Sequence, residues 1–380
     1  MKYSVYQHWD PLKVCIVGRS YSPAFYSFIE NPKARSVMER IARETEEDYQ
    51  KLITLLETFG VEILRPTVSD DYTDYLNDGK ILSPPMTPRD YSIMVGDNFY
   101  FQTNNLLNTS NTMWDQIKGT DWPATPPSSM EEFNSLPKEI KQEFYSIMNS
   151  GVWDWGNVLK KIKKHANVFY KFDRGMPNFS AAMTTRIGKD LYFGTEEGSN
   201  SSELVQKVKN FHPEYRCHIV DTKGHTDGTF CPVVPGLIVS LQDIHTYAET
   251  FPGWEVVYLP DQSWRKVKPF LDLKEKNKGK WWVPGEELND EFTDFVETWL
   301  GHWVGYVEET VFDINMLVID RHNVVCNNYN KEVFEAFERH GITPHIINFR
   351  HRYFWDGGLH CITSDVHREG VMENYFPERG

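Results

Sequence analysis

The sequence contains few cysteines, and no two of them have the spacing of a metal site or a redox motif. The odd count argues against a disulfide framework, and the absence of a CxxC pair argues against a zinc ribbon. There is also no HExxH motif, no carboxylate-rich loop and no glycine-rich phosphate loop. We therefore expect no metal and no organic cofactor, and a reducing, cytoplasmic setting in which a thiol can remain nucleophilic. The five cysteines are Cys15, Cys217, Cys231, Cys326 and Cys361.

Long apolar runs are absent as well. The opening residues Met1 to Ser4 show neither the apolar segment of a signal peptide nor the Arg-rich character of a transit peptide. No apolar stretch approaches the roughly 20 residues that cross a bilayer. The sequence accordingly predicts no membrane partner.

Positive charge is in short supply. Forty Lys and Arg face 54 Asp and Glu, for a formal net charge of -14. An acidic field repels phosphate backbones, so we expect no nucleic-acid partner. The same field favours a cationic small molecule, although acidity also serves solubility alone.

A short pattern recurs along the chain and organises it. Two apolar strands flank a tight turn rich in Gly, Asn or Asp, as hairpins require, and a helix and a third strand follow. Hairpins are predicted at 91–101, 185–193, 229–239 and 315–325. The helices and closing strands that follow them are 158–165 and 168–172, 201–211 and 216–220, 244–251 and 255–259, and 331–340 and 345–349. An opening unit has a strand at 13–17, a helix near 39–59 and a strand at 61–64.

These segments make about five strand–helix–strand units, which fit either an open α/β sheet or a closed ring of blades. Closure removes sheet edges and gives every unit an equivalent place, so the ring is favoured. The predicted fold class is α/β, a five-bladed pseudo-symmetric α/β propeller. No linker divides the chain, which predicts a single catalytic domain over 1–380 with insertions near 103–138 and 263–289. The sequence leaves a homo-oligomer open.

Polar residues cluster at three places that interrupt the repeat. They are Pro-Arg-Asp at 88–90, Gly-His-Thr-Asp-Gly-Thr at 224–229 and Gly-Gly-Leu-His-Cys-Ile-Thr-Ser-Asp at 357–365. Each cluster lies at the start of a predicted inner strand. In a ring such positions converge on the axis, so we expect the three clusters to form one site.

Cys361 is the candidate nucleophile of this site. The preceding glycines, Gly357 and Gly358, permit a close approach of backbone or substrate. A nearby histidine or guanidinium would activate the thiol. The alternative, a buried small apolar residue, is our interpretation of the other four cysteines, which lie in or beside apolar strands. His360 is expected to be structural, because neighbours on a strand point to opposite faces.

His225 is the candidate proton shuttle, and Asp90 and Asp227 are candidate ligands of a cation. His225 lies in a glycine-flanked polar loop, and its ordinary pKa suits proton transfer near neutral pH. A guanidinium is planar and forked and therefore suits carboxylates that accept paired hydrogen bonds. The alternatives are a surface histidine and two turn aspartates. A metal site is also conceivable, without a supporting motif, from His225, Asp227, His360 and Asp365.

With these motifs in sequence order, the chain resembles the amidinotransferases, of the guanidino-modifying (pentein) superfamily that also holds arginine deiminases. The resemblance covers nearly the whole chain, and the last two motifs are the specific ones. It implies a five-bladed α/β propeller, Cys361 as nucleophile, His225 as acid and base, and Asp90 and Asp227 as guanidinium ligands. The segments that carry it are 9–18 (WDPLKVCIVG), 60–66 (GVEILRP), 88–90 (PRD), 175–179 (GMPNF), 225–229 (HTDGT) and 357–365 (GGLHCITSD).

The chain departs from the family pattern at two places. The family usually carries an Asp shortly after the Pro-x-Phe stretch, where it orients the catalytic histidine, whereas here Phe179 is followed by Ser180. Ser180 is therefore a candidate His-orienting position, with Asp173 as another source of the carboxylate. The Arg-rich segment expected after the second hairpin is replaced by 102–109 (QTNNLLNT), which leaves the acceptor open.

The resemblance implies an amidinotransferase that works by a ping-pong reaction. Arginine would give its amidino group to Cys361, and an amine acceptor would then collect it. Two alternatives remain. Water could replace the amine, as in an arginine deiminase, or the chain could be a guanidine-binding protein without catalysis.

Overall fold

The computed structural model describes residues 1–77, 79–101, 118–127, 130–142, 155–170, 179, 181–195, 201–222, 224–241, 246–259, 281–300, 304 and 313–379. Ser180 and Asp173, the two candidates for orienting His225, lie outside these residues. Much of the two predicted insertions does too, although α3 (Met130–Ser135) belongs to the first of them.

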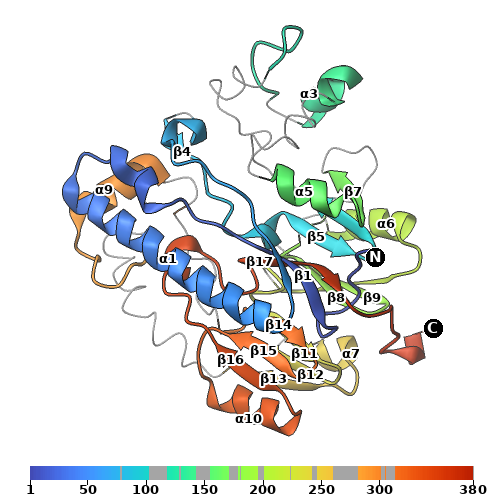
Figure 1. Ribbon diagram of the computed structural model, residues 1–380. Helices are drawn as coiled ribbons and strands as arrows, with labels where there is room; N and C mark the ends of the chain where they lie inside the picture. Colours follow the sequence, from blue (N-terminus) through green and yellow to red (C-terminus); the bar gives the residue numbers. More distant parts are fainter. Residues whose placement is uncertain are drawn as a thin grey trace.

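The described strands form five three-stranded sheets that share one pattern (Figure 1). In each, the first strand is antiparallel to the second, and the third is parallel to the second. The sheets are β17 (Thr363–Arg368), β1 (Leu12–Val17) and β2 (Glu62–Leu64); β5 (Ser92–Val95), β6 (Asn98–Phe101) and β7 (Asn167–Tyr170); β8 (Thr184–Ile187), β9 (Asp190–Gly194) and β10 (Arg216–Val220); β11 (Phe230–Val234), β12 (Leu237–Ser240) and β13 (Glu255–Tyr258); and β14 (Leu317–Asp320), β15 (Asn323–Cys326) and β16 (Thr343–Ile346). The four predicted hairpins and the five closing strands are thereby confirmed. A separate small hairpin joins β3 (Leu76–Asn77) to β4 (Lys80–Ile81).

The pairing of one strand was not part of the sequence prediction. An inner strand was predicted at the cluster 357–365, and β17 is that strand. It supplies the antiparallel partner of the N-terminal strand. β17 pairs antiparallel with β1, with Ile16 opposite Ser364 and Val17 opposite Thr363. The two ends of the chain therefore share one sheet, which places the segment around Cys361 beside the N-terminal strand.

A helix connects the second and third strands of each sheet. These helices are α1 (Pro32–Thr58), α5 (Gly156–Ile162), α6 (Ser201–Phe211), α7 (Tyr247–Thr250) and α10 (Lys331–Arg339). α1 begins earlier than predicted, because the Asn31 side chain accepts the backbone N–H groups of Lys33 and Ala34 and Pro32 occupies the first turn. It ends ahead of Gly60, whose φ of 72° suits a residue without a side chain.

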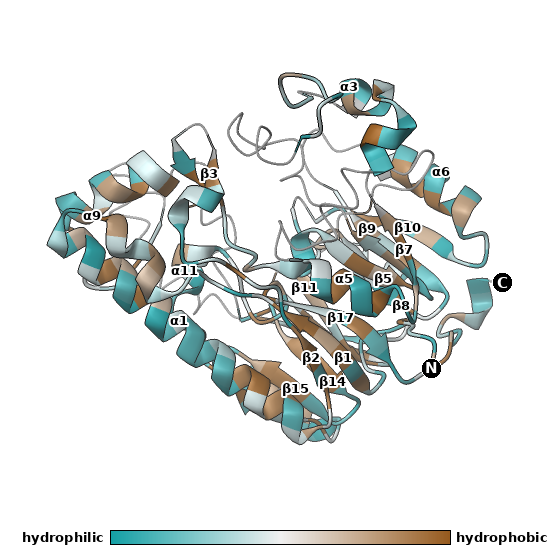
Figure 2. Cartoon of the chain, turned by 45° about the horizontal axis from the view of Figure 1, so that its top comes forward, coloured by the Kyte–Doolittle hydropathy of each residue, from teal (hydrophilic) through white to brown (hydrophobic). Residues whose placement is uncertain are grey.

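The remaining described elements surround these units. They are η1 (Pro23–Phe28), η2 (Tyr72–Tyr75), η3 (Pro88–Asp90), α9 (Asp290–Phe295), η5 (Val296–Leu300), α11 (Arg352–Trp355) and η6 (Pro377–Arg379). Figure 2 shows the apolar strands gathered in the interior, with helices such as α1 turning a hydrophilic face outward. The first strand of each sheet is almost entirely buried, whereas the third strand is largely half-buried or exposed.

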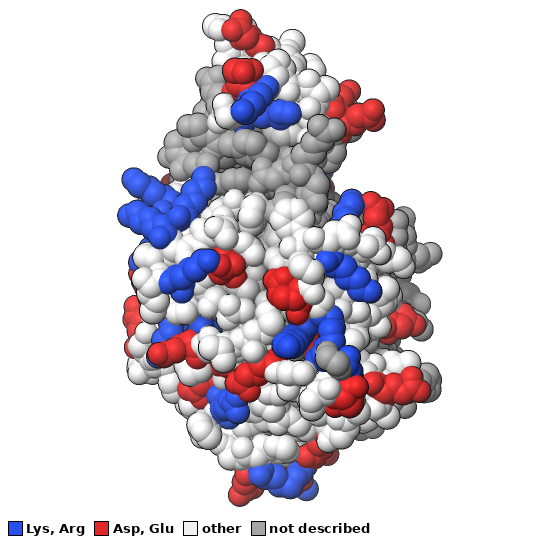
Figure 3. All heavy atoms as spheres, turned by 90° about the vertical axis from the view of Figure 1, so that its right-hand side faces the viewer, with Lys and Arg blue, Asp and Glu red and all other residues white. Residues whose placement is uncertain are grey.

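Charged side chains of both signs are interspersed on the face shown in Figure 3. The acidic net charge therefore does not gather into one large patch on that face. Among the described residues, no helix is long and apolar enough to cross a membrane.

Candidate active site

The candidate residues occupy matching positions in different repeat units. Asp90 stands two residues before β5 and Asp227 three residues before β11. Asn315 stands two residues before β14, and Cys361 two residues before β17. Because the first strands are equivalent members of five similar sheets, residues that precede them come from equivalent places, and direct contacts join three of the four.

Cys361 is buried in the turn ahead of β17, and Asn315 holds it there. The Asn315 amide nitrogen donates a hydrogen bond to Cys361 Sγ at 3.0 Å, and Asn315 Oδ1 accepts the backbone N–H groups of His360 at 2.7 Å and Cys361 at 3.0 Å. A Cβ atom on Gly358 would lie 2.7 Å from Asn315 Cβ and Oδ1. A close approach does occur at this glycine, but the group that approaches is the Asn315 side chain, whereas the sequence predicted backbone or substrate.

Asp227 lies against both the thiol and a histidine. Its Oδ2 is 3.5 Å from Cys361 Sγ and 2.8 Å from His360 Nδ1, while its buried Oδ1 has no hydrogen-bond partner among the described residues. Burial alone would raise the pKa of Asp227. The hydrogen bond and charge of His360, followed by the charges of His225 and Arg89, outweigh it and lower the pKa. Asp227 is therefore an ionised carboxylate with one oxygen still available.

His360 is part of this cluster, although strand alternation predicted that it would point away. The prediction was wrong about geometry, because residues 359–362 form a turn and not a strand, so Cys361 and His360 need not face opposite sides. Burial and the positive charge of Arg89 lower the pKa of His360, against the opposing effect of Asp227. In this pair His360 donates its Nδ1–H to the Asp227 carboxylate, and the hydrogen bond stabilises the ionised form of Asp227.

His225 and Asp90 belong to the same cluster, because their charges interact with each other and with Asp227. The loop of His225 is pinned to the β8 unit, because Thr226 N–H donates to Ala182 O at 2.8 Å. Asp90 is accessible to solvent, but the surrounding protein partly desolvates it and raises its pKa to about 6. The charge of His225 lowers that pKa and the charge of Asp227 raises it, so the three groups lie within one electrostatic neighbourhood.

A buried ion cluster lies directly behind the cysteine loop. Asp365 Oδ1 accepts from Arg89 and Arg186 at 2.7 Å each, and its Oδ2 accepts from Arg368 at 2.7 Å. Burial would raise the pKa of Asp365, but the three guanidinium groups hold it well below its usual range. Three positive charges thus face one negative charge, and the Arg89 backbone N–H donates to the Cys361 carbonyl at 3.3 Å.

The chain is similar to known proteins over most of its length. No protein-family model matches the chain. It is 23% identical to the mitochondrial glycine amidinotransferase of Xenopus tropicalis over 406 residues, which covers 98% of this chain and 84% of that protein. It is 22% identical to the L-arginine:L-lysine amidinotransferase of Pseudomonas savastanoi pv. phaseolicola over 205 residues, which covers 53% of this chain and 47% of that protein.

The chain is therefore similar to amidinotransferases over nearly its whole length. Solved structures agree on the fold. The inosamine-phosphate amidinotransferase StrB1 of Streptomyces griseus superimposes with a TM-score of 0.60 at 18% identity, over 98% of this chain and 99% of that one. SxtG, an amidinotransferase of Microseira wollei in the saxitoxin biosynthetic pathway, gives a TM-score of 0.59 at 17% identity over the same shares. The fold is accordingly the α/β propeller-like fold of these amidinotransferases.

The sequence patterns did not identify Asn315 and Arg89 as parts of the site. A comparison of the repeats with one another could have found Asn315, since it starts a predicted hairpin at the position that Asp90 and Cys361 hold in theirs. Arg89 stood beside Asp90 in a motif, but nothing in the sequence indicated its partner. Among the described residues, no group of three or more His, Cys, Asp or Glu side chains is arranged to hold a metal ion.

Proposed function

We propose that this protein moves an amidino group from arginine to an amine acceptor through a covalent amidino-Cys361 intermediate. The single observation that supports this most directly is the contact of the Cys361 thiol with an ionised carboxylate, Asp227, whose second oxygen is unpaired among the described residues. A guanidinium placed against that oxygen would bring its central carbon next to the sulfur. Asp90, in the same electrostatic neighbourhood, would hold the other edge of the cation.

The reaction divides into two balanced halves. The Cys361 thiolate attacks the guanidino carbon, a carbon–sulfur bond forms, and the bond from that carbon to the side-chain nitrogen of arginine breaks. His225 supplies the proton that this nitrogen takes as ornithine leaves. The acceptor amine then gives a proton to His225 and attacks the same carbon, and the carbon–sulfur bond breaks to restore the thiolate.

Two features around the sulfur favour the thiolate. Asn315 donates a hydrogen bond to Sγ, which is stronger when the acceptor is charged. The ion cluster behind the loop carries an excess of positive charge, since Arg89, Arg186 and Arg368 share the single carboxylate of Asp365. Both effects counter the burial of Cys361 and the negative charge of Asp227 beside it, each of which favours the neutral thiol.

The proposal is tested by incubating the protein with arginine labelled at the guanidino carbon, with and without a panel of primary amines. With an acceptor present, we expect ornithine to be released and the label to appear on one of the amines. Without an acceptor, we expect mass analysis to find the label on the peptide that contains Cys361. Label in urea or citrulline-type products alone would replace transfer by hydrolysis. If neither labelled Cys361 nor a labelled product forms, the protein binds guanidines without catalysis.

The ring arrangement and the setting of the chain are also proposals. We infer that the five sheets close around the Asp365 cluster in one catalytic domain over 1–380. The pairing of β17 with β1 and the contacts of Arg186 with Met94 O and of Arg368 with Val318 O support this, because they join four of the sheets at one carboxylate. The cytoplasmic setting also stays a prediction, since the named glycine amidinotransferase is mitochondrial.

Asp90→Asn and Asp227→Asn are each expected to weaken donor capture. Each change removes a negative charge that would face the guanidinium, and we expect a loss of roughly 2–5 kcal/mol in transition-state stabilisation, measured as kcat/KM for arginine. Because the pKa of Asp90 is raised to about 6, the wild-type kcat/KM should fall as the pH drops through that value and Asp90 becomes protonated. The fall should be absent in Asp90→Asn. Equal kcat/KM in the wild type and both variants would remove the two aspartates from the mechanism.

Asn315→Ala is expected to lower kcat with little change in KM, because Asn315 positions and solvates the sulfur but does not hold the donor. Loss of the bonds to Sγ and to the two backbone N–H groups should cost about 2–3 kcal/mol, or roughly a hundredfold in kcat. The rate of Cys361 alkylation by iodoacetamide at neutral pH should fall as well, a readout that simple loosening of the fold would not slow. Asn323→Ala is the matched control, since Asn323 lies in the same hairpin unit but bonds to Asp320. Unchanged alkylation in Asn315→Ala would contradict the role.

A further inference from the structure

A second cavity lies away from the cysteine, between the start of α1 and the α9–η5 segment. Its volume is about 480 Å³, within the range of small-molecule sites. Four aromatic side chains form its walls: Phe28, Tyr72, Phe295 and Trp299. We call it the aromatic pocket. None of its lining residues belongs to the group around Cys361, so it is distinct from the proposed active site.

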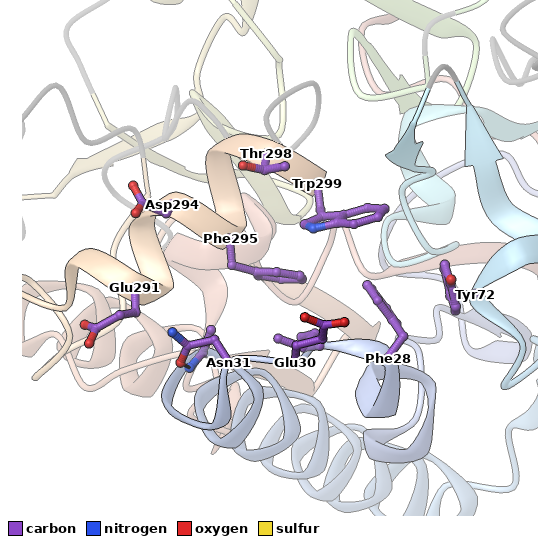
Figure 4. A pocket seen from close by; sticks show the side chains of 11 residues that line it. Phe28, Glu30, Asn31, Tyr72, Glu291, Asp294, Phe295, Thr298 and Trp299 are labelled. Carbon is purple, nitrogen blue, oxygen red and sulfur yellow. Dashed lines mark hydrogen bonds between the residues drawn. The ribbon is translucent and has the colours of Figure 1, made fainter.

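The aromatic rings are ordered around Phe28. Tyr72 stacks on Phe28 with ring centroids 4.0 Å apart, and Trp299 meets Phe28 edge-on at 5.3 Å. Figure 4 shows Phe295 and Trp299 reaching from one wall toward Phe28 on the other. Phe28, Tyr72 and Trp299 are only partly buried, so faces of these rings remain accessible to a ligand. Ring faces carry negative potential and attract cations.

Carboxylates surround the same space. Glu30, Glu291 and Asp294 all line the pocket. Lys33 pairs with Glu291 at 2.5 Å, while within the described part of the chain neither Glu30 nor Asp294 takes part in an ion pair. The lining therefore carries more negative than positive charge, next to exposed aromatic faces.

The backbone of one wall is unusual as well. η5 (Val296–Leu300) is a π-helical turn, a rare geometry that occurs often at functional sites, and it carries Thr298 and Trp299. The Lys80 ammonium donates to the carbonyl groups of Glu297 at 3.0 Å and Thr298 at 2.6 Å. These two hydrogen bonds fix the backbone of the turn, and with it the position of Trp299 at the pocket.

We propose that the aromatic pocket binds a small organic cation, a guanidinium or ammonium compound with a short apolar body. The charge would lie near Glu30 and Asp294, and the planar or methylene part would lie against Phe28 and Trp299. The cavity is large enough to hold a small molecule. Aromatic ring faces together with the carboxylates of Glu30 and Asp294 attract organic cations. The inference is independent of the proposed reaction.

The test uses a matched pair of probes, butylguanidinium and its neutral isostere butylurea. The protein is prepared with 5-fluorotryptophan, and the ¹⁹F resonance of Trp299 is assigned by its loss in Trp299→Phe. To silence the proposed donor site, the titration is repeated in Asp90→Asn/Asp227→Asn. We expect the Trp299 resonance to shift saturably with butylguanidinium in both proteins and to stay in place with butylurea.

A second pair of variants separates charge from shape. Glu30→Gln/Asp294→Asn should weaken the butylguanidinium response about tenfold, as the loss of close charges to a cation predicts. Glu203→Gln, on the surface of α6, should leave it unchanged. The proposal is overturned if the Trp299 resonance does not move, or if it moves equally with butylurea. Loss of the response in Asp90→Asn/Asp227→Asn alone would also overturn it, because the binding would then belong to the donor site.

Discussion

Cys361→Ala is expected to abolish turnover while leaving the fold in place. The proposed reaction passes through a bond between the sulfur and the guanidino carbon, and no other nucleophile stands at that position among the described residues. By comparison with the loss of a nucleophile in other covalent enzymes, kcat should fall by about a thousandfold or more. The measurement is ornithine release from arginine in the presence of an acceptor amine.

Cys326→Ala is the matched control for that experiment. Cys326 is also a buried thiol, but it lies in β15 beside Met316, and burial raises its pKa well above the usual value. Its removal should cost only stability, on the order of 1 kcal/mol, as for a small buried apolar group. Near-wild-type activity in Cys361→Ala, or equal losses of activity in both variants, would show that the nucleophile lies elsewhere.

Asp365→Asn should produce the largest loss of stability of any single polar change in the described structure. It leaves Arg89, Arg186 and Arg368 buried together without the carboxylate to which all three donate, and breaking a buried pair in this way typically costs about 3–5 kcal/mol. Because the folded-state pKa of Asp365 is depressed, its contribution is present above the unfolded-state value, near 4, and is lost as the pH falls below it. Chemical unfolding of wild type and variant at pH 7 and at acidic pH measures both effects.

Glu203→Gln provides the surface comparison for Asp365→Asn. Glu203 pairs with Lys207 one turn along α6, and exposed pairs of this kind are worth about 0–1 kcal/mol. Its unfolding midpoint should remain close to that of the wild type. A midpoint for Asp365→Asn that is equally unchanged would mean that the three guanidinium groups are stabilised by something other than this carboxylate.

Local pattern in the sequence determined the repeat units. Alternating apolar residues around Gly, Asn and Asp turns specify hairpins through short-range geometry, and helices such as α10 begin at an Asn cap and end ahead of a glycine. The sequence also identified four candidate residues for the same reason: Cys361, Asp227, Asp90 and His225. Each lies in a polar segment that breaks an apolar pattern at the start of an inner strand.

Only the tertiary structure decided how these segments meet. β17 pairs with β1 across more than 300 residues. Such a pairing satisfies the free edge of a strand with a partner that is distant in sequence, so it depends on how the rest of the chain folds. Asn315 contacts Cys361 from the segment ahead of β14, and Arg89, Arg186 and Arg368 converge on one carboxylate from η3, β8 and β17. His360 faces Asp227 because a turn replaces the expected strand. Such contacts depend on side chains that are distant in sequence, and local periodicity carries no information about which distant partner a buried polar group will find.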